Sequence, residues 1–160
     1  MSAAGTTATV IGVGNVLMGD DGAGIAVIEM LRTGALEIGP ALPDGTRLVD
    51  GGTLGLDLLG YVREAGALVI VDAVDRGDIP GAVCVLRGDE LGSAGAVGEL
   101  LDTARLVGWL PERVALIGIQ VGSTGQGPGL SEPVAAALPR AAALVKTELR
   151  ALAARAEAAV

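Results

Sequence analysis

The chain has 160 residues, of which 51% are hydrophobic, and its formal net charge at pH 7 is -8. This length favours a single domain, residues 1–160, with one core, and the negative charge argues against binding to nucleic acid or to an anionic membrane surface. The chain has no histidine, which excludes a Ser-His-Asp triad, a Cys-His pair and a histidine-ligated zinc site.

The first half of the chain alternates between strand and helix patterns. An apolar run predicts a strand over residues 8–13, and apolar residues at helical spacing predict a helix over 22–33. A loop rich in Gly and Pro leads to a short strand at 46–49, after which Thr53 is expected to cap a second helix. Consecutive apolar residues at 67–71 predict a strand that is buried on both faces.

The second half continues the alternation. We expect a strand at 82–86, a helix at 96–107, a strand at 114–119 and a last helix that opens at Ser131. Pro139 is expected to kink or split this helix. The charged side chains of the helix are expected to face solvent.

Together these elements predict an α/β fold, a three-layer α/β/α sandwich around a five-stranded, mostly parallel sheet. The strand at 82–86 follows the strand at 67–71 after a loop too short for a crossover helix. We therefore predict that this one strand is antiparallel.

Residues 12–24 read GVGNVLMGDDGAG and carry the most information. A strand, a tight glycine loop and a helix start form a geometry that usually holds phosphate. Here Asp20 and Asp21 make the loop negative, so it is expected to attract a cation, a metal or a polar neutral group. One of the two aspartates is expected to cap the helix.

Further acids are placed at the ends of neighbouring strands. Asp72 ends the strand at 67–71 and Asp50 ends the strand at 46–49. If the second and third strands flank the first, the strand order reverses beside Asp21, where open α/β sheets bind ligands. Each acid could instead serve a turn or a cap, but several carboxylates in one crevice require a cation or a shared proton.

Dinucleotide binding is a weaker alternative. Gly12 and Gly14 follow a strand, and Asp50 lies where a ribose-binding acid would lie. However, Leu17 replaces the third glycine of the fingerprint, and the two loop aspartates would face the pyrophosphate.

Three motifs, in this order, resemble those of the hydrogenase maturation proteases: Gly12 to Gly24, Asp50 to Thr53 (DGGT) and Val71 to Ala73 (VDA). The resemblance runs from the first strand through the last helix. It implies a cytoplasmic endopeptidase that removes a C-terminal peptide from the large-subunit precursor of a nickel–iron hydrogenase after nickel insertion. It also implies that nickel comes with the precursor, with no organic cofactor; we expect a monomer that contacts neither nucleic acid nor membrane.

The resemblance assigns roles to residues of this chain. Asp21 and Asp72 match the acids that contact nickel, and we expect them to be catalytic as well. The residues expected to position substrate are Gly14, Asn15, Asp50, Gly51 and Gly52.

The family's third nickel contact is a histidine near the start of the helix predicted at 96–107. Ser93 or Gly95 stands at that place here, and Gln120 stands where the family usually has a proline. Two interpretations follow. In the first, two carboxylates and water are enough to bind the nickel because the precursor supplies its other ligands. In the second, the chain is a degenerate member that senses metal or binds a partner without cleaving it.

Overall fold

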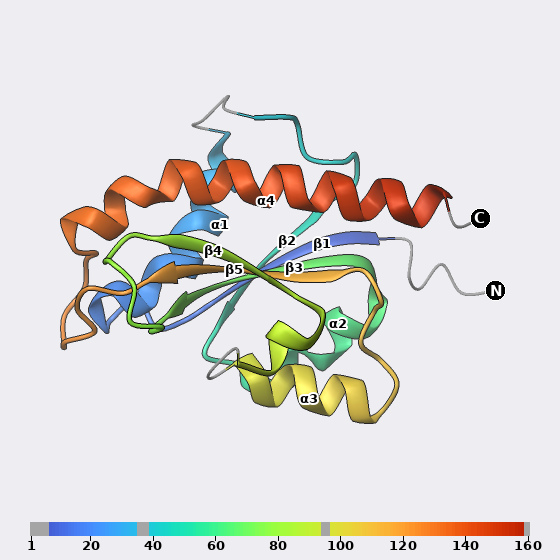
Figure 1. The fold of residues 1–160 in the computed structure, drawn as a ribbon, viewed down its shortest axis with the longest axis horizontal. Coiled ribbons are helices and arrows are strands. Elements are labelled where there is room, and N and C mark those ends of the chain that lie inside the picture. Colours follow the sequence, from blue (N-terminus) through green and yellow to red (C-terminus); the bar gives the residue numbers. More distant parts are fainter. Residues whose placement is uncertain (1–6, 35–38, 94–96, 159–160) are drawn as a thin grey trace.

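The computed structural model describes residues 7–34, 39–93 and 97–158 (Figure 1). A five-stranded sheet forms the middle layer, in the order β2-β1-β3-β5-β4. Its strands are β1 (Thr7–Val13), β2 (Arg47–Gly52), β3 (Ala65–Val74), β4 (Val83–Arg87) and β5 (Val114–Gln120).

The strand pairing confirms the predicted topology. β1 pairs in parallel with β2 and β3, and β3 pairs in parallel with β5. β4 is antiparallel to β5, as the short connection at 75–82 requires. The strand order reverses between β1 and β3, so the loop after β1 and the carboxyl end of β3 meet at one edge of the sheet.

Helices cover both faces of the sheet. The α-helices are α1 (Ala23–Thr33), α2 (Leu59–Glu64), α3 (Gly98–Leu106) and α4 (Glu132–Ala158). Three short 3-10 helices are η1 (Gly19–Gly22), η2 (Gly55–Leu58) and η3 (Gly88–Ser93). In Figure 1, α4 runs along one face of the sheet beside α1, and α2 and α3 lie on the opposite face. The α/β/α layers predicted from the sequence are therefore confirmed.

Two predicted helix caps are wrong. Gly22 is the N-cap residue of α1 and makes no side-chain capping bond, because the carboxylates of Asp20 and Asp21 bind other partners. Thr53 does not cap the second helix either, since Leu54 occupies the N-cap position of η2. The 3-10 turns η1 and η2 thus lead into α1 and α2, where a direct helix start was expected.

For the last helix, one of the two outcomes expected at Pro139, a split, is wrong, and the other, a kink, stays a prediction. α4 continues unbroken from Glu132 through Pro139 to Ala158, so the proline does not split it. Its buried residues, among them Val134, Val145 and Leu149, pack into the core shared with α1 and the sheet. This packing offsets the hydrogen bond that a proline removes from a helix interior.

One charge on α4 is buried against the expectation of a solvated surface. Glu148 is only 9% exposed, and its two carboxylate oxygens accept hydrogen bonds of 2.6 and 2.7 Å from the Arg87 guanidinium. Arg87 lies at the end of β4, so this ion pair joins the edge strand to the helix layer. No helix in the described part of the chain has the length and apolar character that crossing a membrane requires.

Candidate active site at the carboxyl edge of the sheet

The glycines of the first motif allow an unusually close approach between α1 and the sheet. A Cβ atom on Gly24 would lie 2.5 Å from the carbonyl oxygen of Val13 and would also collide with the carbonyl oxygen of Val71. Only glycine fits at this position. The start of α1 and the preceding turn η1, which carries Asp21, are thereby held against β3 directly before Asp72.

Asp72 and Asp21 interact electrostatically. Asp72 is only 5% exposed, more buried than the open crevice inferred from the sequence would leave it. Burial raises its pKa to about 7, the Ala73 amide opposes the shift by donating a hydrogen bond, and the negative charge of Asp21 adds to it. The Asp21 carboxylate is partly exposed and accepts a hydrogen bond of 2.8 Å from the Asn15 amide. The structure thus brings the two predicted catalytic acids together.

Asp20 lies beside Asp21 in sequence but in a different environment. Its side chain is fully buried and accepts hydrogen bonds from Gly122, Ser123 and Ser131, in the loop between β5 and α4. Burial alone would raise the pKa of Asp20, but these bonds outweigh it and hold the pKa below its ordinary value. The two aspartates of the motif therefore have distinct partners.

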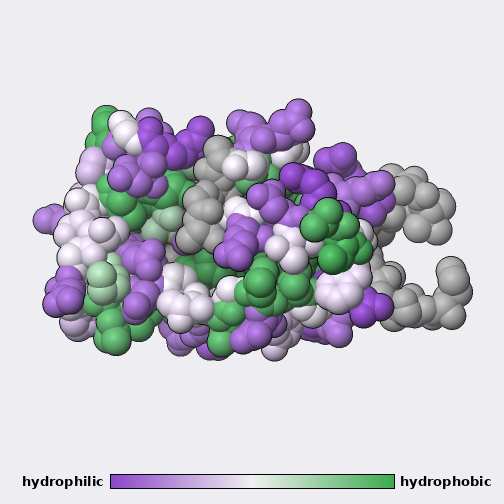
Figure 2. Space-filling view, turned by 90° about the horizontal axis from the view of Figure 1, so that it is seen from below, coloured by the Kyte–Doolittle hydropathy of each residue, from purple (hydrophilic) through white to green (hydrophobic). Residues whose placement is uncertain are grey.

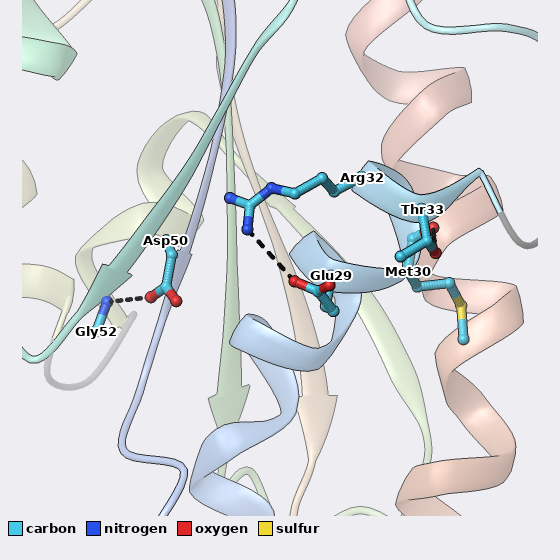
Figure 3. Close-up of polar contacts among 6 residues, drawn as sticks. All are labelled: Glu29, Met30, Arg32, Thr33, Asp50 and Gly52. Carbon is cyan, nitrogen blue, oxygen red and sulfur yellow. Dashed lines mark hydrogen bonds and ion pairs between the residues drawn. The ribbon is translucent and has the colours of Figure 1, made fainter.

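Asp50 lies at the same edge but on the opposite face of the sheet from Asp72. Both Asp50 and Val71 are paired with Gly12 across parallel strands, so their side chains share a face, and Asp72 points to the other. Figure 3 shows Asp50 on the side of the sheet that carries α1, with its carboxylate bonded to the Gly52 amide at 3.1 Å. Its role in substrate binding stays a prediction.

The other residues expected to position substrate shape the two neighbouring loops. The Gly14 amide donates to the Gly52 carbonyl at 2.9 Å, which joins the loops after β1 and β2. The Asn15 side-chain oxygen accepts a bond of 2.9 Å from the Leu17 amide, and Gly51 is packed against Leu58 and Ile11. In this structure these groups organise the loops beside the acidic pair, and direct contact with a substrate stays a prediction.

Gln120 has a structural role that the sequence did not predict. It is 4% exposed, and its side-chain oxygen accepts hydrogen bonds from the amides of Arg76 and Asp78 at 2.8 and 3.3 Å. Its side-chain nitrogen donates to the Asp75 carboxylate at 3.1 Å. Gln120 thereby fixes the segment that follows Asp72. No sequence signal marks this role, because the bonded residues lie more than 40 positions apart.

Apolar side chains are exposed on the loops that surround this edge. Val16 and Leu17 lie after β1, and Leu54 and Leu56 lie after β2. Figure 2, viewed from the side of α2 and α3, shows hydrophobic groups at the surface among hydrophilic ones. Loops are the part of a protein where binding residues are most often found.

The described residues hold no cluster of three or more His, Cys, Asp or Glu side chains that could bind a metal ion. The two residues predicted to replace the third nickel contact lie at or beyond the limit of the described residues. Ser93 ends η3, but its side chain lies outside the described part, as does the whole of Gly95. Of the predicted nickel contacts, Asp21 and Asp72 are the two whose side chains lie in the described part of the chain.

Comparisons with known proteins agree on one family. A model of the hydrogenase maturation proteases matches residues 34–148. The hydrogenase expression/formation protein HupD of Rhodobacter capsulatus is 39% identical over 153 residues, a match that covers 89% of this chain and 70% of HupD. The hydrogenase 2 maturation protease of Escherichia coli K12 is 32% identical over 151 residues, covering 88% of this chain and 89% of that protein.

Solved structures give the same result. The hydrogenase maturating endopeptidase HybD from E. coli superposes with a TM-score of 0.78 and 29% identity, over 89% of this chain and 91% of HybD. The maturation protease HycI from Thermococcus kodakarensis KOD1 superposes with a TM-score of 0.69 and 25% identity, over 91% and 93% of the two chains. These matches leave the dinucleotide-binding alternative without support. The chain belongs to the hydrogenase maturation protease family.

Proposed function

We propose that this protein is an endopeptidase that removes a C-terminal peptide from the nickel-loaded large-subunit precursor of a nickel–iron hydrogenase. Family membership supports the peptidase class and the hydrogenase partner. The observation that carries the site assignment is the pairing of Asp21 with the buried Asp72 at the strand-order reversal.

The pair can take part in recognition through its negative charge. Two carboxylates that repel each other gain stability when a cation arrives, and carboxylate oxygens are suitable ligands for divalent metals. A nickel ion held by the precursor would lower the pKa of Asp72 and draw both carboxylates to the metal. The precursor's nickel would thus place the scissile bond beside Asp21 and Asp72, while Val16, Leu17, Leu54 and Leu56 offer apolar contact to the rest of the precursor.

The pair can also move protons during aspartic-type hydrolysis. The pKa of Asp72 near 7 lets this side chain hold or release a proton at neutral pH. The Asp21 carboxylate can accept a proton from the water that attacks the scissile carbonyl. The same Asp21 carboxyl group can then pass that proton to the leaving amine, while Asp72, which releases its proton when the nickel binds, holds the metal.

The test is mass spectrometry of a hydrogenase large-subunit precursor after incubation with this protein. We expect the nickel-loaded precursor to lose one C-terminal peptide and the nickel-free precursor to stay intact. Equal cleavage of both precursors would refute nickel recognition, and a precursor mass that never changes would refute the peptidase assignment.

The absence of histidine favours a second candidate, a module of the same fold that binds the precursor without cleaving it. This candidate predicts that the precursor and the protein co-elute from a gel-filtration column while the precursor mass stays constant. It also predicts that Ser93→His or Gly95→His introduces cleavage. Cleavage by the unmodified chain would exclude it.

We place this reaction in the cytoplasm, with the protein acting as a monomer and without an organic cofactor. These statements follow from the resemblance and composition described above. Fractionation of cells that produce the tagged protein tests the location, and sedimentation equilibrium tests the oligomeric state.

A further inference from the structure

The Asp20 carboxylate is fully buried and held entirely by groups from a distant part of the chain. Its Oδ2 atom accepts hydrogen bonds of 2.7 Å each from the Gly122 amide, the Ser123 amide and the Ser131 hydroxyl. Its Oδ1 atom accepts a bond of 2.6 Å from the Ser131 amide. All of these donors lie 102 to 111 positions later in the sequence. A buried charge needs such partners, and short bonds to a carboxylate are among the stronger hydrogen bonds in proteins.

Backbone contacts join the same two loops. The Asp20 amide donates to the Ser123 carbonyl at 2.7 Å, and Gly127 exchanges bonds with Gly19 and Leu17 at 3.0 and 2.8 Å. Gly19 has a φ of +56°, and a Cβ atom there would lie 2.7 Å from the Ser123 carbonyl oxygen. The loop after β1 and the loop after β5 therefore form one connected unit.

Asp21 follows Asp20 directly and serves the acidic pair. Its carboxylate accepts the Asn15 amide and raises the pKa of Asp72 through its charge. The peptide bond between Asp20 and Asp21 makes their positions dependent on each other. Since Asp20 is anchored to the β5–α4 loop, the same anchor fixes where the Asp21 carboxylate lies.

We propose that Asp20 is a positioning residue for the cleavage reaction, which holds the Asp21 carboxylate opposite Asp72 by anchoring the loop after β1 to the loop after β5. The inference rests on the proposed function, but it adds a role for the first aspartate of the motif. Asp20 makes no contact with the substrate in this account. The β5–α4 loop, residues 121–131, becomes part of the active site because it carries the anchor.

The substitution Asp20→Asn tests this role with little change in shape. An amide nitrogen would face the amide and hydroxyl donors that now bind the carboxylate, so part of the anchor is lost. Ser131→Ala removes only the hydroxyl donor and keeps the backbone donor, so we expect this milder variant to fold even if Asp20→Asn does not. Asp102→Asn on the exposed face of α3 is the matched control.

The first readout is cleavage of the nickel-loaded precursor, well below the melting temperature of each variant. We expect kcat to fall by a factor of 10 or more in Asp20→Asn and by a factor between 3 and 10 in Ser131→Ala, with KM changed less than threefold. Asp102→Asn should match the wild type. A kcat within twofold of wild type in folded Asp20→Asn, or in Ser131→Ala if Asp20→Asn does not fold, would overturn the proposal.

The second readout does not need cleavage and separates this proposal from the proposed function. Amide hydrogen exchange of the free protein should show faster exchange at Asn15 in Asp20→Asn, because the Asp21 carboxylate is no longer held against it, while the amides of β3 and β5 keep their protection. Unchanged protection at Asn15 would overturn the positioning role. If the wild type leaves the precursor intact, the proposed function fails, and the exchange at Asn15 alone decides whether Asp20 positions Asp21.

Discussion

Asp20 and Asp72 show that the environment can shift the pKa of two residues of one type in opposite directions. Both are buried, and burial raises the pKa of a carboxyl group. The hydrogen bonds to Asp20 outweigh this effect, whereas the single backbone bond to Asp72 does not, and the charge of Asp21 adds to the upward shift. Asp20 is therefore suited to structural anchoring as an anion, and Asp72 to gaining and losing a proton.

The raised pKa of Asp72 makes stability depend on pH. Between the ordinary value of 3.8 and about 7 the folded protein holds a proton on Asp72 that the unfolded chain has released. Stability from this group is therefore present below about pH 4 and falls as the pH rises to about 7. At about 1.4 kcal/mol per pH unit the loss is on the order of 4 kcal/mol at most.

Urea unfolding of the wild type and Asp72→Asn at several pH values between 4 and 8 measures this effect. The difference in the free energy of unfolding between the two proteins should shift in favour of the variant as the pH rises. Asp21→Asn should shrink the shift, since it removes the charge that helps to raise the pKa of Asp72. A difference that stays constant with pH would contradict the account.

At the scale of elements, the junction between β1 and α1 depends on close backbone contact. Gly24→Ala places a Cβ atom against the carbonyl oxygens of Val13 and Val71, although alanine is the better helix former. We expect a loss of about 2 kcal/mol or more in the free energy of unfolding, in the range of overpacked core sites. Thermal and urea denaturation would measure it.

Gly60→Ala is the matched control for this prediction. Gly60 lies in α2, is exposed, and a Cβ atom there would meet no heavy atom within 4 Å. Here the helix propensity of alanine should act alone and stabilise the protein by about 0.5–1 kcal/mol. Equal effects of the two substitutions would show that backbone contact at Gly24 is unimportant.

The elements themselves were largely predictable because their signals are local. Apolar runs and helical spacing located the strands and helices, and the short segment between β3 and β4 indicated the antiparallel pair. The caps were not predictable in this way. An aspartate before a helix normally caps it, but Asp20 instead bonds to residues more than 100 positions away, which no local pattern contains.

At the scale of the whole molecule, the ion pair of Arg87 and Glu148 joins the edge strand to α4 across 61 positions of sequence. The two side chains differ in exposure, at 57% for Arg87 and 12% for Glu148. Removal of the arginine leaves a mostly buried carboxylate without its partner, whereas removal of the glutamate leaves an arginine that water can solvate.

Arg87→Leu should therefore destabilise the protein more than Glu148→Leu. We expect a cost of about 1–3 kcal/mol for Arg87→Leu, the penalty for a buried acceptor that loses its donor, and less for Glu148→Leu. Urea unfolding at pH 7 compares them, with Arg32→Leu as a control from the exposed pair with Glu29 (Figure 3). A larger cost for Glu148→Leu would contradict this reasoning.

The site was predictable at the scale of the molecule to the extent that topology decides it. Adjacent positions of β1 and β3 in the sheet brought Asp21 and Asp72 to one edge, as their places after two strands suggested. The face of each side chain was harder to foresee. Asp50 reaches the same edge, yet strand alternation turns it to the side of α1, and only the register with Gly12 and Val71 reveals this.

The most direct test of the central claim is a double-variant cycle on Asp21 and Asp72, with kcat for cleavage of the nickel-loaded precursor as the readout. If the two acids act as one unit, Asp21→Asn, Asp72→Asn and the double variant should each lose about the same large factor, because removal of either acid disables the pair. Asp102→Asn, on the exposed face of α3, should cleave like the wild type. Losses that multiply in the double variant, or cleavage by the double variant at the wild-type rate, would contradict the account.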